Sequence, residues 1–416
     1  MEASFNRNEI VQNLGAEKIY EIIIYGREEF QASLYNEIIK VFFQRLSEEN
    51  MDFFQFAKSN NFEKIEIFLE AATTYNQVNQ LFDNIKNPAQ KIQLLNLFIS
   101  NIIKQKNIEN AITLAEITTN IKDNTLLNFL ENKIIEIFNE TQDLTVKNIF
   151  GLLFSNLIDQ RSQNLTNKQF FNTFDKEKYE LPVIDRVPSS EIFDSEGRNT
   201  QQYFFYNDAD GRTSFENFLK KYQIDSRWEI YDRNSFVIIH AKNPETSKQI
   251  LIYANKPEFD GITDKNKNAI KDIKADMEIF DPPLTPAITV HRGHFFHAWK
   301  TIQYLSLTAK IVLFGSCESY FNFANVLFKS PDADIISTTG EGTRFINDPF
   351  FKIINDEILA GKDIVWKDVW EKAAAAESSH KRYEQLKDDP RFQYYVRPDE
   401  NFRVRFVKKF KELEQG

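Results

Sequence analysis

The spacing of apolar residues changes between about residues 160 and 200 of this 416-residue chain. Up to about residue 160 they recur at helical spacing, as Ile38, Phe42 and Leu46 do. Side chains four positions apart stack on one face of an α-helix. Short polar breaks separate several such segments, so we expect residues 1–165 to form a helical bundle or an irregular helical repeat.

Beyond about residue 200 the chain shows short apolar runs with strand character. Residues 166–200 are polar and contain Pro182 and Pro188, so we expect a linker or a strapped surface segment there. The later runs alternate with helix-like stretches, which is typical of a mostly parallel sheet covered by helices on both faces. We therefore expect residues 201–416 to form an α/β domain, with strands near 202–207, 228–232, 235–241, 249–255, 287–291, 310–315 and 333–339 and a long helix over 366–387.

The composition indicates a folded protein that binds neither nucleic acid nor membranes. The net charge of −10 opposes binding to nucleic acid or to an anionic membrane surface. No apolar run reaches the roughly 18 residues that a membrane span needs. A single cysteine cannot form an intramolecular disulfide, and the first residues lack the basic and then apolar pattern of a signal peptide. We therefore expect a cytoplasmic protein.

Most of the residues suited to catalysis lie in two short segments. The segment ITVHRGHFFH holds His291, His294 and His297, three of the five histidines, and the segment KIVLFGSCE holds Cys317, the only cysteine. Each segment begins as an apolar strand candidate, and ligands in doubly wound sheets bind beyond the carboxyl ends of the strands. If the two strands are neighbours, about 5 Å apart, the residues after them face one cleft. A helix predicted shortly after Cys317 and a nearby imidazole would both favour the thiolate.

These two segments give the chain a resemblance to a known family. An apolar strand that ends in Gly293-His294, followed by one that ends in Ser316-Cys317, resembles the catalytic core of the caspase-like (clan CD) cysteine peptidases, the group of gingipain, clostripain, separase, legumain and the CHAT peptidases. The family usually has a glycine after the histidine, where this chain has Phe295. A helical segment ahead of the α/β domain also resembles the architecture in which helical repeats control a CHAT peptidase.

The resemblance implies a caspase-like α/β domain, a cysteine endopeptidase activity and a polypeptide substrate. Cys317 would be the nucleophile and His294 the acid-base group, with His291 as the second candidate for the histidine. The residues that bind the oxyanion or support the dyad would be Gly293, Gly315, Ser316 and His291. We hypothesise that the N-terminal helices gate this peptidase through a protein partner or an intramolecular contact.

The substrate pocket and the cofactor are less constrained by the sequence. Asp332 and Asp334 follow the next predicted helix and are candidates for a pocket that binds Arg or Lys, although solvated loop positions are the commoner role of such residues. No P-loop or dinucleotide fingerprint occurs in the chain, so we expect no nucleotide and no other cofactor.

Two other classes of function remain open. The first is a non-catalytic protein that uses a caspase-like fold as an interaction scaffold. The second is a metal-dependent hydrolase, in which His291, His294 and His297 bind zinc or another transition metal. Gly293 and the preceding strand disfavour the single helix that would align these three histidines, so we expect no metal.

Overall fold

The computed structural model describes residues 11–26, 32–161, 166–243, 245, 247–257, 265–317, 319–378 and 380–415. The chain divides into two compact units: one comprises Met1–Pro182 and Lys409–Gly416, and the other comprises Val183–Lys408. The boundary between them falls inside the predicted linker. The last helix, α19 (Phe402–Gln415), is assigned partly to each unit. Within the described part of the chain, no helix is long and apolar enough to cross a lipid bilayer.

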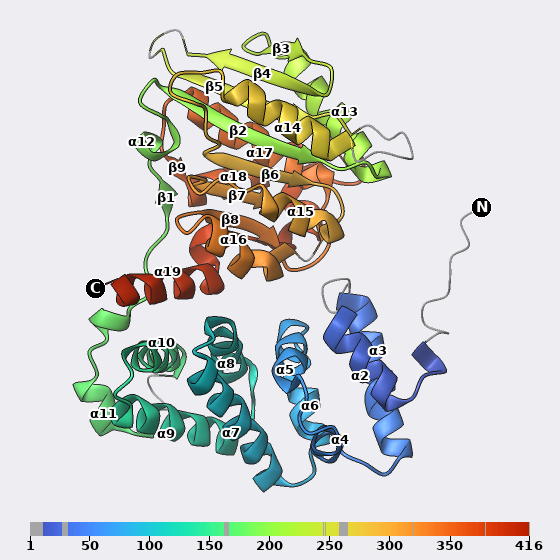
Figure 1. The fold of residues 1–416 in the computed structure, drawn as a ribbon, viewed down its shortest axis with the longest axis vertical. Coiled ribbons are helices and arrows are strands. Elements are labelled where there is room, and N and C mark those ends of the chain that lie inside the picture. The colour runs from blue at the N-terminus through green and yellow to red at the C-terminus, as the bar shows by residue number, and fades with distance from the viewer. Residues whose placement is uncertain are drawn as a thin grey trace. The chain divides into compact units, whose positions relative to one another are not determined.

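The first unit is helical (Figure 1). The polar breaks between its helices act as caps: the side chains of Asn87, Asn107 and Asp123 accept hydrogen bonds from the first backbone N–H groups of α7, α8 and α9. The elements of this unit, besides the end of α19, are α2 (Ala16–Gly26), α3 (Ala32–Glu48), α4 (Phe53–Ser59), α5 (Ile65–Thr74), α6 (Val78–Asn84), α7 (Pro88–Gln105), α8 (Ile108–Asn120), α9 (Asn124–Glu140), α10 (Leu144–Arg161), α11 (Lys168–Thr173) and η2 (Glu177–Tyr179).

Hydrogen bonds between these helices recur at a constant separation along the chain. They connect α3 with the start of α6, α6 with α8, and α8 with α10. Each joins residues 41 positions apart, in the pairs Asn36–Gln77, Asn79–Asn120, Ala115–Asn156 and Thr119–Gln160. Stacked helical units that contact only their neighbours produce such a constant separation. The contacts therefore favour the irregular helical repeat over the bundle.

The second unit contains an eight-stranded, mostly parallel sheet. Its strand order is β10-β8-β7-β6-β2-β5-β4-β3. Strands β2, β5, β6, β7 and β8 are parallel, whereas β10, β4 and β3 each pair with a neighbour in the antiparallel direction. The strands are β2 (Arg198–Phe205), β3 (Glu229–Asp232), β4 (Phe236–Lys242), β5 (Gln249–Asn255), β6 (Ile288–Arg292), β7 (Ile311–Phe314), β8 (Asp334–Thr338) and β10 (Tyr395–Val396). The predicted mixture of a helical part and an α/β part is therefore confirmed.

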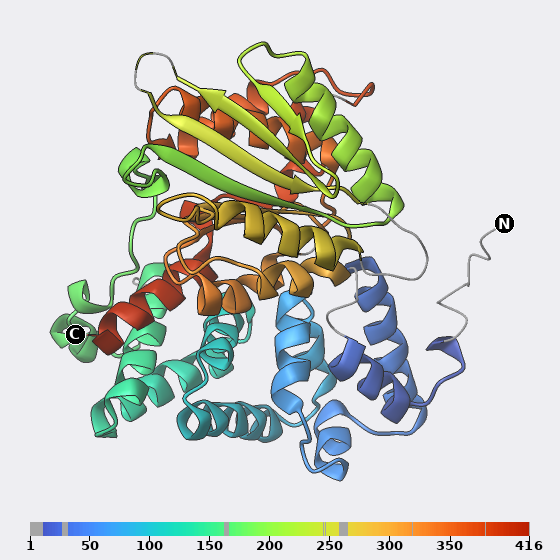
Figure 2. The same cartoon turned by 45° about the horizontal axis from the view of Figure 1, so that its top comes forward.

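Helices cover both faces of this sheet, whose strands are twisted relative to one another (Figure 2). In β5, Ile250 and Ile252 pack in one core with residues of α13, α17 and α18, whereas Leu251 and Tyr253 pack in another with α14. Burial on alternate faces explains why the strand is continuously apolar. The helices of this unit are α12 (Ser189–Ile192), α13 (Ala209–Gln223), α14 (Lys265–Met277), α15 (Ala298–Gln303), α16 (Phe323–Lys329), α17 (Arg344–Leu359) and α18 (Trp366–Ala375).

Residues 166–200, predicted as a linker or a strapped surface segment, hold short helices, the strand β1 (Arg186–Val187), which pairs with β9 (Ile364–Val365), and the start of β2. One expectation about local structure is wrong. The helix predicted over residues 366–387 ends at Ala375. A continuous helix would carry Leu386 about 30 Å from residue 366, whereas the chain turns back and buries Leu386 in the same core as Trp366.

Candidate active site

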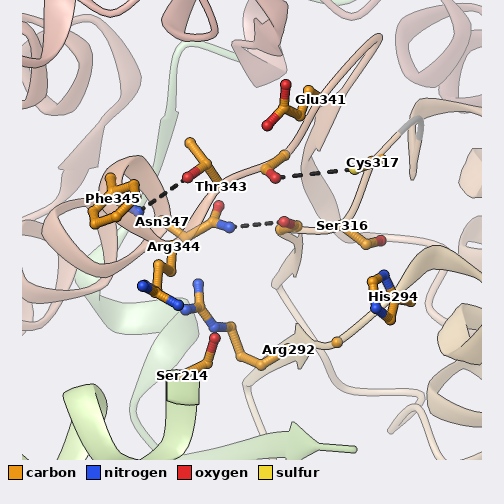
Figure 3. A pocket seen from close by; sticks show the side chains of 13 residues that line it. Ser214, Arg292, His294, Ser316, Cys317, Glu341, Thr343, Arg344, Phe345 and Asn347 are labelled. Atoms are coloured by element: carbon orange, nitrogen blue, oxygen red, sulfur yellow. Dashed lines mark hydrogen bonds between the residues drawn. The ribbon is translucent and has the colours of Figure 1, made fainter. Parts of the chain in front are cut away.

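The strand order creates one position where a ligand site is expected. The first strand of the parallel group, β2, lies between β5 on one side and β6, β7 and β8 on the other. The connections therefore change direction between β2 and β6, and in doubly wound sheets the crevice lies beyond the carboxyl ends of the strands near this point. A pocket of about 230 Å³ opens there (Figure 3). Its walls come from Ser214 of α13 and from residues 292–294, 315–317, 341–345 and 347.

The register of two neighbouring strands brings His294 and Cys317 to this pocket. Strands β6 and β7 pair in parallel, and the last pair places His291 opposite Phe314. His294 and Cys317 each lie three residues beyond that pair, after strands about 5 Å apart. Both side chains line the pocket, and Figure 3 shows Ser316 between them. The two residues that the sequence singles out are thus brought together.

The loop that carries Cys317 is held by hydrogen bonds to its backbone. Side-chain donors reach three successive carbonyl oxygens, so the orientations of these peptide groups are set. The three hydrogen bonds to these carbonyl oxygens are Ser319 Oγ to Phe314 O at 2.8 Å, Asn347 Nδ2 to Gly315 O at 2.7 Å, and Thr338 Oγ1 to Ser316 O at 2.6 Å. The Sγ atom of Cys317 itself lies 3.9 Å from the carbonyl oxygen of Gly342.

Two glycines permit this close packing. A Cβ atom on Gly315 would lie 2.4 Å from Nδ2 of Asn347, and a Cβ atom on Gly342 would lie 2.5 Å from the carbonyl oxygen of Gly315. A carbon atom does not approach a heavy atom to which it is not bonded this closely, so a larger residue at either position would push the loop of Cys317 away from the segment after β8 or from α17. Gly315, predicted as a supporting residue, therefore lets Asn347 of α17 reach the loop that carries Cys317.

His291 is buried and is not among the described residues that line the pocket. Its Nδ1 lies 2.7 Å from Oγ1 of Thr301, and its Nε2 lies 3.2 Å from the carbonyl oxygen of His294. Burial lowers the pKa of His291 to about 3, because the charged imidazolium would lose its hydration. The ring is therefore neutral at physiological pH and fixes the backbone of His294.

The three histidines do not assemble a metal site. Both ring nitrogens of His291 are engaged in hydrogen bonds. His297 stacks on the ring of Tyr206, with centroids 4.5 Å apart, and its Nε2 lies 3.5 Å from Oδ2 of Asp208. In the part of the chain that the structure describes, no group of three or more His, Cys, Asp and Glu residues could hold a metal ion.

The prediction that Asp332 and Asp334 form a substrate pocket is wrong. Asp334 is the first residue of β8 and pairs in register with Ile311, the first residue of β7. It therefore lies at the amino end of the strands, opposite the pocket. Its side chain is buried, accepts a hydrogen bond from Nε1 of Trp366 and lies 2.6 Å from Nζ of Lys408. Asp332 is exposed and pairs with Lys310 at 3.1 Å.

Two arginines that the sequence reasoning missed line the pocket instead. Arg292 ends β6, and its side chain is 2% exposed. Arg344 begins α17. A signal for Arg292 was present, because it is a charged residue between His291 and Gly293 at the end of an apolar strand. Arg344 had no such signal, since its position depends on how the segment after β8 folds over the loop of Cys317.

Comparisons of the chain with models of protein families, with curated proteins and with solved structures found no match.

Proposed function

We propose that the α/β unit is a caspase-like cysteine peptidase in which Cys317 and His294 form the catalytic dyad. The observation that supports this proposal is that both residues line one pocket, and that each lies three positions beyond the last residue pair of two neighbouring strands, His291 with Phe314. Histidine after one strand and cysteine after the next is also the order on which the resemblance to the family rests.

The acylation step follows from the chemistry of a thiol beside an imidazole. His294 accepts the proton of the Cys317 thiol, and the thiolate attacks the carbonyl carbon of the scissile peptide bond. A new S–C bond forms, and the carbonyl electrons move to oxygen. When the carbonyl reforms, the C–N bond breaks, and His294 gives its proton to the leaving amine.

Deacylation uses the same two residues with water as the second reactant. His294 removes a proton from water while the water oxygen bonds to the acyl carbon. The S–C bond then breaks, and the thiolate of Cys317 recovers the proton from His294. The products are a carboxylic acid and an amine, with no change in oxidation state, so this reaction needs no cofactor.

Backbone N–H groups near Gly293 and Cys317 are the proposed donors to the oxyanion. In a trans peptide the N–H points away from the C=O. The carbonyl of Ser316 is bonded to Thr338, so the N–H of Cys317 points away from Thr338. Each such donor typically contributes about 3 kcal/mol to stabilisation of the transition state.

The N-terminal helical repeat has a separate proposed role. Stacked helical repeats present extended surfaces on which partner proteins bind. We therefore retain the hypothesis that this unit controls the peptidase through a protein partner or an intramolecular contact.

The test uses Cys317→Ala and His294→Ala, with His240→Ala on β4 as the matched control for removal of an imidazole away from the pocket. Cleavage of a peptide library should fall to near background in both site variants, because the two side chains act on one transition state. The control should cleave at the wild-type rate. Iodoacetamide at pH 6 should alkylate wild-type Cys317, whereas an unactivated thiol is nearly inert at that pH.

Two results would contradict the proposal. One is a Cys317→Ala protein that keeps wild-type cleavage of a substrate that the wild type cleaves. The other is a wild-type protein that cleaves no peptide and whose thiol has ordinary reactivity, which would support the non-catalytic scaffold instead.

A further inference from the structure

A chain of buried hydrogen bonds leads from Tyr206 to the backbone of His294. The hydroxyl of Tyr206 lies 2.8 Å from Oγ1 of Thr301, and the same Oγ1 lies 2.7 Å from Nδ1 of His291. On the other side of the imidazole ring, Nε2 lies 3.2 Å from the carbonyl oxygen of His294. Tyr206, Thr301 and His291 are at most 3% exposed, so the bonds between these side chains are shielded from water.

The three side chains come from different parts of the second unit. Tyr206 follows β2, Thr301 is in α15 and His291 is in β6. Strands β2 and β6 pair in parallel, and the backbone N–H of Tyr206 donates to the carbonyl oxygen of Arg292 at 3.2 Å. Tyr206 is therefore held beside the end of β6. The chain of hydrogen bonds attaches the backbone of His294 to two segments besides the strand that precedes it.

The directions of these bonds follow from the neutral state of His291. Burial lowers the pKa of this ring to about 3, and a neutral imidazole has one N–H and one acceptor nitrogen. A carbonyl oxygen can only accept, so Nε2, which faces the carbonyl of His294, carries the proton and Nδ1 is the acceptor. The hydroxyl of Thr301 therefore donates to Nδ1, and its oxygen accepts a hydrogen bond from the hydroxyl of Tyr206.

The carbonyl oxygen of His294 receives two hydrogen bonds. The backbone N–H of His297 donates to it at 3.0 Å, and Nε2 of His291 is the second donor. A carbonyl oxygen has two lone pairs, and these two donors use both of them. The side chain of His294 itself is exposed, so packing does little to fix it. The placement of its imidazole therefore depends on how firmly the backbone of His294 is held.

We propose that Thr301 and Tyr206 are positioning residues for His294. This inference rests on the peptidase function proposed above, in which His294 is the acid-base group. Thr301 holds the ring of His291 in the orientation that donates to the carbonyl of His294, and Tyr206 directs the hydroxyl proton of Thr301 toward His291. Neither is among the described residues that line the pocket. They act through the placement of the imidazole, because proton transfer needs the acid-base group within hydrogen-bond reach.

Two substitutions at Thr301 separate the hydroxyl from the methyl group. Thr301→Val keeps the shape and removes the donor, so kcat on a peptide that the wild type cleaves should fall about tenfold, the typical effect of one hydrogen bond, while KM changes less than about twofold. Thr301→Ser keeps the donor and should retain most of the wild-type kcat. Tyr206→Phe leaves the Thr301 donor in place and should lower kcat less than Thr301→Val does. A role in packing alone predicts the opposite order for Val and Ser.

The rate at which iodoacetamide alkylates Cys317 at pH 6 is a readout that needs no peptide. A nearby imidazole favours the thiolate, so displacement of His294 in Thr301→Val should slow alkylation, and Thr301→Ser should restore it. Thr118→Val is the matched control. Thr118 is buried in α8 and donates to the carbonyl oxygen of Ala115 at 2.7 Å, so this variant loses the same kind of bond away from the pocket and should keep the wild-type kcat and alkylation rate.

The position of the proton on His291 can be measured directly by NMR. The ¹⁵N chemical shift of an imidazole nitrogen depends on whether it carries a proton, and His291→Gln identifies the signals of this ring. At pH 7 we expect the proton on Nε2 in the wild type. A proton on Nδ1 would overturn the inference whether or not the protein cleaves peptides.

The remaining outcomes separate this inference from the peptidase proposal. Wild-type kcat and alkylation in Thr301→Val, or a larger loss in Thr301→Ser than in Thr301→Val, would overturn the positioning role and leave the peptidase intact. A wild-type protein that cleaves no peptide and has a thiol of ordinary reactivity overturns the peptidase proposal, and the positioning role with it.

Discussion

Replacement of Gly342 by alanine tests how closely the segment after β8 holds the loop of Cys317. The backbone of Gly342 is not in the left-handed region, so alanine fits its conformation and the effect is steric. The added Cβ would lie 2.5 Å from the carbonyl oxygen of Gly315 and 2.8 Å from the carbonyl carbon of Ser316. These are backbone atoms, which cannot rotate away as a side chain can.

The size of the expected effect follows from these distances. Ordinary contact needs about 3.4 Å, so the Gly315 carbonyl must move by 3.4 − 2.5, or about 0.9 Å. A misplacement of about 1 Å at a catalytic group can cost about 100-fold in rate, which corresponds to about 2.7 kcal/mol. Overpacking should also lower the free energy of unfolding by about 1–3 kcal/mol.

Two measurements on Gly342→Ala are informative together. We expect kcat/KM to fall about 100-fold, and we expect the rate of alkylation of Cys317 by iodoacetamide to change, because the surroundings of the thiol move. Gly15→Ala is the control, since its added Cβ has no atom within 4 Å and should leave both rates unchanged. Wild-type values of kcat/KM and of the alkylation rate in Gly342→Ala would refute the reasoning.

Two further predictions concern buried charges. The folded protein keeps His291 neutral down to about pH 3, whereas in the unfolded chain this histidine binds a proton below about pH 6.5. The free energy of unfolding should therefore fall by up to about 1.4 kcal/mol per pH unit as the pH drops through this window. Urea titrations at several pH values should show a weaker dependence of the unfolding free energy on pH in His291→Gln than in the wild type, and an equal dependence would contradict the prediction. Asp334→Ala leaves the ammonium of Lys408 partly buried and without its carboxylate partner, so urea titration should show that the free energy of unfolding falls by about 3–5 kcal/mol. The preference among peptide substrates should not change. A changed preference with the wild-type free energy of unfolding would contradict the placement of Asp334 away from the pocket.

Much of the second unit follows from local sequence patterns. Each of the seven predicted strand segments overlaps an observed strand, because burial on both faces leaves a continuous apolar run that is visible without any knowledge of contacts. The placement of His294 and Cys317 followed from the same pattern. Residues just after two neighbouring parallel strands must share an edge of the sheet, and only the identity of the neighbours had to be assumed.

The details of the pocket lie outside such patterns. Asp334 and Arg344 are both charged residues near the ends of apolar segments. Only the fold shows that Asp334 pairs with Lys408 at the amino end of β8, whereas Arg344 faces the loop of Cys317 at the carboxyl end. The turn of the chain after Ala375 had the same cause, because the burial of Leu386 beside Trp366 overrides a helical pattern.

The sequence by itself determined the division into helical and α/β parts and the two catalytic candidates, because hydrophobic period and position at a strand end are properties of consecutive residues. The tertiary structure alone decided which histidine reaches the pocket, which glycines must stay small and which charges surround the thiol. Those properties depend on burial and on contacts between segments distant in the chain, such as Gly315 with Gly342 and Arg292 with Asp348, and no local pattern of residues encodes them.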